Sequence, residues 1–354
     1  MRVAALVLAS MLSAACGEAR APVAAPTVPR EGAAAAPAPA HAQIAPVGKM
    51  TLRRMPDGML FVTKSGAWLV GDGDPITVAH VTRGETTRDA ALDAALAKAK
   101  VTAIEAIEER GGRLVLSTTA GGAQAVFTWT GRALEPSALS EKAGPARLAV
   151  DPDDANANQE EIERGRIVVE PADRYPRAPT QVTKLRGQLV MDDGGLVVIG
   201  HVEGSLAAET WRAPHQPARM DLLPDLPPQF VWDPHLAPQA AILASPSPGH
   251  ACVVPFAFVE SQGVRYLACF DGERWRGIST GGLDGVIASL AGAEGWIWVT
   301  TFADARGVFR RRLDGDWERV GALEDAGSAE VRMRSAREVY VVDGTRSWVA
   351  LEQP

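Results

Sequence analysis

The feature that most constrains the fold of this chain is a repeat of short apolar strands punctuated by glycine. Residues 111–134 and 294–317 share one pattern: a glycine, a four-residue apolar run, a Thr-rich exit, a loop, a Val-Phe strand and a Gly turn before a large apolar residue. A unit of this kind cannot bury its apolar face alone, so neighbouring copies must stack. The body is therefore predicted to be all-β.

Weaker copies of the pattern occur at an average spacing of about 46 residues, which is the length of a four-stranded propeller blade. The pattern resembles the loosely defined repeats of bacterial extracytoplasmic propellers and matches neither the WD40 nor the kelch signature. We therefore expect residues 49–354 to form a β-propeller-like domain of six or seven irregular four-stranded blades. The anchors of the units are Gly58, Gly112, Gly165, Gly195, Gly249, Gly295 and Arg337.

Two Asp-Gly phrases, at residues 270–275 and 313–317, each end in tryptophan. Asp-Gly favours a tight turn in which the backbone takes a positive φ. The tryptophan would then begin the next strand and pack between neighbouring blades.

Residues 86–100 interrupt the strand pattern with a helical one. Thr86 could cap the helix and Asp89 could complete a capping box, while Leu92 and Leu96 fall on one face. We expect a short helical insertion over a blade edge or the rim of the propeller.

An acidic segment with alternating oxygen ligands offers weak candidates for calcium, namely Asp154, Asn156 and Asn158. Gln159 stands where an EF-hand loop needs glycine, and Gly165 stands where it needs a bidentate glutamate. A solvated loop is the favoured interpretation. The six histidines have no metal-binding spacing, and no catalytic motif is present. We therefore assign no catalytic residue and expect no cofactor.

Cys252 and Cys269 lie near the two ends of a segment that reads as a β-hairpin. A two-residue turn at Glu260 and Ser261 would place them opposite one another, whereas a turn at Gln262 and Gly263 would leave them too far apart for a disulfide. A disulfide, two buried free thiols and a redox or metal role all remain open.

The N-terminus has the pattern of a secretory signal over residues 1–15, with Arg2 before a short apolar run and small residues after it. Residues 12–16, Leu-Ser-Ala-Ala-Cys, resemble the lipobox of bacterial lipoproteins. The resemblance implies a lipid on Cys16 and cleavage just before it. Ser13 departs from the family pattern, because leucine usually stands three residues before the cysteine. A soluble secreted protein, cleaved after Ala15 or Ala21, is the alternative.

In relatives of the lipoprotein family an aspartate after the cysteine retains the protein at the inner membrane. Gly17 stands there, so the resemblance favours the outer membrane of a Gram-negative bacterium. Residues 16–48 are rich in alanine and proline, which favours an extended, disordered tether. Two or more acyl chains would make a durable anchor.

The formal net charge is −7, and no basic stripe is interleaved with aromatic residues. Nucleic acid is therefore not expected as a partner. We expect an envelope-anchored propeller that serves as a scaffold or binding module for a protein of the cell envelope. The alternatives are a glycan-active hydrolase or lyase, and a surface protein that binds carbohydrate through exposed Trp232, Trp296 or Trp298.

Overall fold

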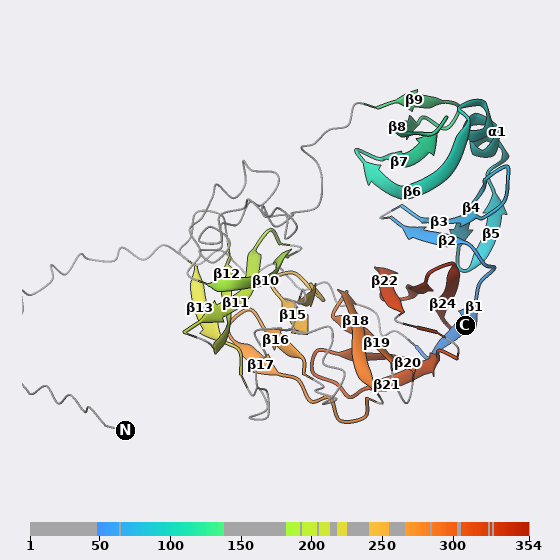
Figure 1. Cartoon of the computed structure of the whole chain (residues 1–354). Coiled ribbons are helices and arrows are strands. Elements are labelled where there is room, and N and C mark those ends of the chain that lie inside the picture. The colour runs from blue at the N-terminus through green and yellow to red at the C-terminus, as the bar shows by residue number, and fades with distance from the viewer. Residues whose placement is uncertain are drawn as a thin grey trace, which may run out of the picture. The chain divides into compact units, whose positions relative to one another are not determined.

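The computed structural model confirms the all-β prediction. The residues that it describes form 24 strands and one helix, and the strands make six four-stranded antiparallel sheets (Figure 1). We call these sheets blades 1 to 6. The described residues are 48–63, 65–137, 182–191, 193–203, 205–212, 218–224, 241–254, 266–283, 285–302, 306–324, 326–327 and 329–353.

Each of the first three blades consists of four strands consecutive in the chain. Blade 1 contains β2 (Met59–Val62), β3 (Ala67–Gly71), β4 (Thr77–Thr82) and β5 (Glu85–Arg88). Blade 2 contains β6 (Val101–Arg110), β7 (Arg113–Ala120), β8 (Ala123–Trp129) and β9 (Leu134–Pro136). Blade 3 contains β10 (Thr183–Val190), β11 (Leu196–Val202), β12 (Ser205–Trp211) and β13 (Arg219–Leu222).

The next two blades repeat this order, and the last one breaks it. Blade 4 contains β14 (Ile242–Ala244), β15 (Ala251–Val254), β16 (Ala268–Phe270) and β17 (Trp275–Gly277). Blade 5 contains β18 (Val286–Ala293), β19 (Trp296–Phe302), β20 (Gly307–Arg312) and β21 (Glu318–Ala322). Blade 6 contains β22 (Glu330–Ser335), β23 (Glu338–Asp343), β24 (Arg346–Glu352) and, from the other end of the chain, β1 (Met50–Arg54).

Neighbouring blades pack face to face through their apolar side chains. Contacts between strands place the blades in the order 2, 1, 6, 5, 4, 3, and a buried apolar cluster lies between the members of each successive pair. A sheet covered on both faces needs apolar residues at successive positions rather than alternate ones. The sequence of β19, WIWVTTF, meets this need, and six of its seven residues are buried.

Hydrogen bonds also join the first hairpin turns of neighbouring blades. In each case a backbone group in one turn meets a side chain or backbone group of the next blade, so the turns are tied together as well as the apolar faces. The pairs are Ser65 with Glu109, Ser65 with Arg334, Ala336 with Glu294, and Gly295 with Pro246.

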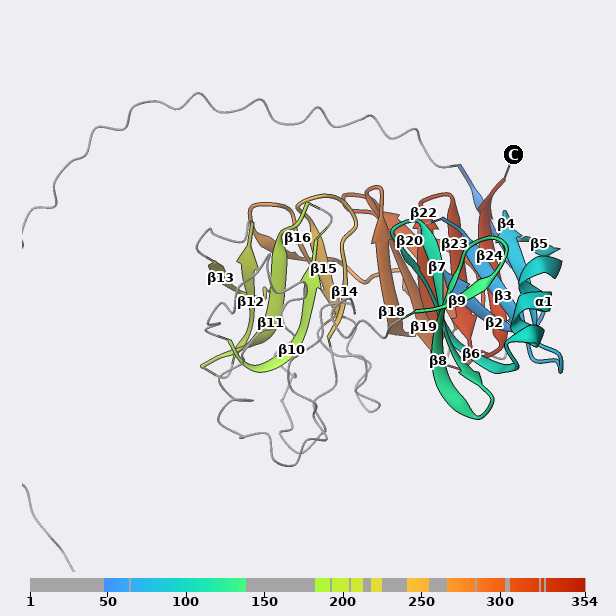
Figure 2. The same cartoon turned by 90° about the horizontal axis from the view of Figure 1, so that it is seen from above.

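The two ends of the body meet in blade 6. β1 pairs antiparallel with β24, from Met50 opposite Glu352 to Arg54 opposite Trp348. Figure 2 shows the first strand, in blue, beside the C-terminus. Since β1 forms the outer edge of the last blade, it covers backbone groups of β24 that would otherwise form an open sheet edge.

β1 also contacts the blades on both sides of blade 6. Arg53 forms an ion pair with Glu85 of blade 1 at 3.0 Å. Leu52 packs so closely on Gly321 of blade 5 that a Cβ added to this glycine would lie 2.8 Å from the Leu52 Cβ. A glycine is therefore required where the first strand crosses blade 5.

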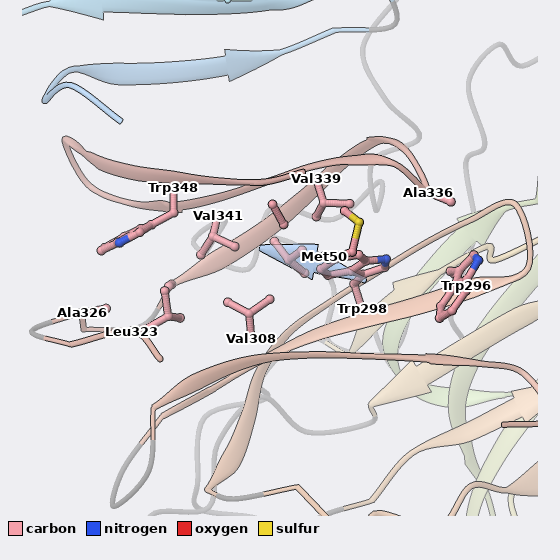
Figure 3. Packing of buried hydrophobic residues seen from close by; sticks show 13 residues of the cluster. Met50, Trp296, Trp298, Val308, Leu323, Ala326, Ala336, Val339, Val341 and Trp348 are labelled. Atoms are coloured by element: carbon pink, nitrogen blue, oxygen red, sulfur yellow. The ribbon is translucent and has the colours of Figure 1, made fainter. Parts of the chain in front are cut away.

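Arg310 of β20 fixes the point where the chain enters β1. It is buried, with 2% of its surface exposed, and its guanidinium lies 4.6 Å from the Trp296 ring centre and 5.8 Å from that of Trp298. It donates to Glu318 at 2.9 Å and to the Gly48 carbonyl at 2.7 Å. Both tryptophans belong to the cluster between blades 5 and 6, where Met50 of β1 lies beside Trp298 (Figure 3).

The predicted helix forms, but it starts later than expected. α1 spans Ala90–Lys98, and Asp89 is its N-cap, accepting a hydrogen bond from the Leu92 backbone N–H at 2.9 Å. Thr86 instead belongs to β5, because residues 85–88 pair with β4. Leu92 and Leu96 are buried between blades 1 and 2, against which the helix lies (Figure 2).

The Asp-Gly turn at Asp271 and Gly272 has the expected geometry, with a φ of 90° at Gly272. The Asp271 carboxylate accepts the backbone N–H groups of Glu273 and Arg274 at 2.9 Å. Trp275 then begins β17 and packs between blades 3 and 4, as predicted.

Two sequence predictions differ from the structure: the geometry of the second Asp-Gly turn and the positions of some repeat anchors. Gly315 does not have a positive φ. Gly58 lies just before β2, one strand earlier than the first-turn position that Gly112, Gly249 and Gly295 occupy in their blades. Gly165 lies outside the described residues.

Replacing Arg310 by alanine is expected to destabilise the protein by about 3 kcal/mol, because a buried cation–π stack and two charged hydrogen bonds are lost together. The matched control is Arg312→Ala, since Arg312 is exposed and lies 5.7 Å from the same Trp296 ring. Arg312→Ala should lower the free energy of unfolding by less than about 1 kcal/mol. Urea unfolding measures both, and equal losses would contradict the role given to Arg310.

Candidate functional site

A polar recess lies where blades 1 and 6 meet, between the β4–β5 turn, the β22–β23 turn and the end of β24. It consists of two adjoining cavities of about 440 and 410 Å³ that share Arg83, Ser335 and Glu338. We call it the arginine recess. Its charged lining consists of Arg83, Arg334, Arg337, Glu338 and Glu352.

The β4–β5 turn places Arg83 in the recess. Its two central residues both have positive φ, 51° at Arg83 and 75° at Gly84, which is the geometry of a type I′ hairpin turn. Asn or Asp is favoured at the first position, and an arginine there costs about 1 kcal/mol. Gly84 is required, because an added Cβ would lie 2.7 Å from both Arg53 and Val349 of blade 6.

The inner wall of the recess is a fixed network centred on Glu338. Its carboxylate accepts from Arg334 at 2.8 Å, from the Tyr340 hydroxyl at 2.5 Å and from the Arg83 backbone N–H at 3.4 Å. Arg334 also donates to the Ser65 carbonyl of blade 1 at 3.2 Å. These hydrogen bonds fix the positions of the side chains in the absence of a ligand, so this wall is preorganised.

The outer wall is built around Glu352, which accepts from the Gly48 backbone N–H at 2.5 Å and pairs with Arg337 at 3.3 Å. Glu352 thereby holds Gly48, just before β1, beside the recess. The Arg337 side chain is 51% exposed and therefore reaches solvent.

Arg83 differs from the other two arginines of the recess. Arg334 pairs with Glu338, and Arg337 pairs with Glu352. The exposed Arg83 guanidinium makes no ion pair or hydrogen bond within the described part of the chain. The recess therefore carries one uncompensated positive charge beside a rigid wall.

Burial raises the pKa of Tyr340, and its hydrogen bond to Glu338 raises it further, because the neutral phenol donates to the carboxylate. Tyr340 is fully buried. It therefore supports Glu338 as a neutral donor and does not act as an acid near neutral pH.

A second cavity, of about 520 Å³, lies on blade 2 beside Arg113, Trp129 and Glu135. Trp129 is only 8% exposed and belongs to the apolar cluster between blades 1 and 2. This ring is mostly committed to packing, so the arginine recess is the better candidate.

The structure joins Cys252 and Cys269 in a disulfide, with the two residues directly opposite in β15 and β16 and their Cα atoms 4.1 Å apart. This is the first of the two registers considered from sequence. The sulfurs lie in the apolar cluster between blades 4 and 5. Closing a loop of 17 residues stabilises a fold by about 3 kcal/mol.

The tryptophan platform considered from sequence is not supported where the structure describes it. Trp296 is 8% exposed and Trp298 is fully buried, so both are core residues. Trp232 lies outside the described residues, as do Cys16 and the calcium candidates Asp154, Asn156 and Asn158.

Within the described ranges, no group of three or more His, Cys, Asp and Glu side chains is arranged to hold a metal ion. No helix in that same part of the chain is long and apolar enough to cross a membrane.

The arginine recess was not predicted from the sequence. One signal was present: Arg83 and Gly84 stand between two strands at a place where Asn-Gly is the common turn. The remaining lining comes from residues about 250 positions away, which only the pairing of blades 1 and 6 brings near.

Comparison with known proteins finds similar solved structures only at low sequence identity. No family model matches it, and no curated protein matches it either. Virginiamycin B lyase from Staphylococcus aureus is 9% identical over 86% of this chain and 99% of its own, with a TM-score of 0.43. YCF48 from Cyanidioschyzon merolae is 11% identical over 85% and 98%, with a TM-score of 0.45. Likenesses this distant carry no argument about activity.

Stability should fall as the pH rises above about 10, because unfolded tyrosine ionises there while folded Tyr340 stays protonated. The contribution is complete below the unfolded pKa and is lost as the pH rises toward the folded pKa, at about 1.4 kcal/mol per pH unit. In Tyr340→Phe, the free energy of unfolding should therefore fall less steeply with pH. Urea unfolding from pH 9 to 11 tests it, and equal slopes in the two proteins would refute the assignment.

Proposed function

We propose that this protein is an envelope lipoprotein whose propeller-like body is a binding module for a protein partner. Two sequence features support the location: the lipobox-like residues 12–16 and the alanine- and proline-rich tether over residues 16–48. The disulfide between Cys252 and Cys269 supports it as well, because such bonds persist in oxidising compartments.

The observation that carries the binding role is the arginine recess. Its walls are held by ion pairs and hydrogen bonds to backbone groups, and one cation, Arg83, is left for a ligand. Preorganised polar groups beside an exposed charge cost little to order on binding. A partner that docks here would lie next to Gly48, where the tether joins the body.

The glycan-active enzyme and the carbohydrate-binding protein are the competing functions. No specific observation in the described residues favours either, and Trp296 and Trp298 are buried. Both remain as outcomes of the experiments.

Site-specific photo-crosslinking in cells tests the binding role. A photoreactive residue replacing Thr82, at the exposed rim of the recess, should yield one discrete adduct with an envelope protein. The same residue replacing Arg132, in an exposed turn of blade 2 outside the recess, should not. A glycan adduct would favour the carbohydrate-directed alternatives, and no adduct at residue 82 would refute the proposed partner.

Metabolic labelling with a clickable palmitate analogue tests the anchor. The full chain should incorporate the label and fractionate with the outer membrane, and Cys16→Ala should abolish both. Cys252→Ala is the matched control, since loss of a buried disulfide cysteine should leave labelling unchanged. An unlabelled wild-type protein would end the lipoprotein interpretation.

A further inference from the structure

We infer that Arg83 is the recognition residue of the arginine recess and that it binds a carboxylate on an acidic segment of the protein partner. This inference rests on the proposed function and adds the chemistry of the contact. Three observations carry it: the backbone conformation of Arg83, the absence of a partner for its guanidinium within the described residues, and the charge balance of the recess.

The backbone conformation is unfavourable for arginine. A φ of 51° is a left-handed conformation that Asn, Asp and Gly adopt more readily in this turn. No side-chain contact offsets this conformational cost, because the exposed guanidinium makes no ion pair or hydrogen bond among the described residues. Lys100 and Glu203 have similar φ values and also have no side-chain partner in the described part of the chain, so the strain at Arg83 points to a functional role because Arg83, unlike them, lines a recess.

Glu294 provides an internal comparison. It has nearly the same φ, 52°, and also precedes a glycine of positive φ in a hairpin turn. Its carboxylate, however, accepts the Ala336 backbone N–H at 3.2 Å and so ties blade 5 to blade 6. Glu294 therefore has a structural contact in its turn, whereas the Arg83 side chain has none among the described residues and can bind a ligand.

The charge balance selects the ligand. Among the described residues that line the recess, Arg83, Arg334 and Arg337 face Glu338 and Glu352, which leaves a net charge of +1. A carboxylate neutralises that charge and can accept two parallel hydrogen bonds from one guanidinium. A phosphate dianion would bring excess negative charge beside two glutamates, which repel it. The balance therefore favours a glutamate or aspartate side chain.

The test uses the purified full chain and an amidated tetrapeptide, acetyl-Gly-Glu-Gly-Gly, with its Gln twin as the uncharged probe. Binding is followed by nuclear magnetic resonance through the Gly84 amide, which lies next to Arg83. The glutamyl peptide should bind at least ten times more tightly than its glutaminyl twin, and the preference should weaken as salt is added. Inorganic phosphate serves as a competing anion.

Arg83→Asn is the decisive variant, because Asn suits the left-handed turn and removes the cation. It should unfold at a temperature no lower than that of the wild type, yet lose the glutamyl preference at least tenfold. Arg83→Lys should retain part of that preference, since the charge remains but the planar fork is lost. Arg132→Asn, which removes an exposed turn arginine outside the recess, should change nothing.

Several results would overturn the inference. Equal binding of the two peptides, unchanged binding by Arg83→Asn, or tighter binding of phosphate than of the glutamyl peptide would each do so. A clear fall in the unfolding temperature of Arg83→Asn would also count against it, by showing a structural task. The proposed function fails separately: a crosslink at residue 82 that persists in Arg83→Asn refutes only the carboxylate contact, and peptide binding without a cellular adduct refutes only the partner.

Discussion

The rest of the structure depends on the pairing of β1 with β24. Blades 1 to 5 are each made from consecutive strands, and only blade 6 joins chain segments about 300 residues apart. Without β1, the last blade would have three strands and an open edge. The pairing also costs more loop-closure entropy than any hairpin in the molecule. The contacts that β1 makes with blades 1 and 5, through Arg53 and Leu52, are the local interactions that offset this cost.

The same closure creates the arginine recess. The β4–β5 turn is lodged against β1 and β24, since Gly84 lies against Arg53 and Val349. That placement sets Arg83 beside Glu338 and Glu352, which belong to the last two strands of the chain. The site is therefore formed by the same pairing that completes blade 6. A partner bound there would contact the first and last blades together.

The sequence predicted what local pattern controls. Apolar runs on both faces of the strands gave the all-β stacking, Asp89 and the two leucines gave the helix, and Asp271 with Gly272 gave a turn. It did not predict what tertiary pairing controls. The local pattern predicts Thr86 to be a helix cap. It does not show that the backbone of Thr86 pairs with β4, and this pairing keeps the residue in β5. The register of the cysteine hairpin was left open for the same reason, and the pairing of β15 with β16 places Cys252 opposite Cys269.

The arginines show why the recess in particular could not be predicted. Arg310 and Arg83 are the same residue type, each near a strand end of a similar repeat unit. Arg310 lies against two tryptophans and donates to the Gly48 carbonyl, so its charge stabilises the packing of β1 on blade 5. Arg83 sits in a strained turn and gains no such return. Burial and partners separate a structural arginine from a recognition arginine, and both are properties of blade packing. A sequence pattern fixes the strand that carries the residue, whereas the neighbouring blade decides what the residue does.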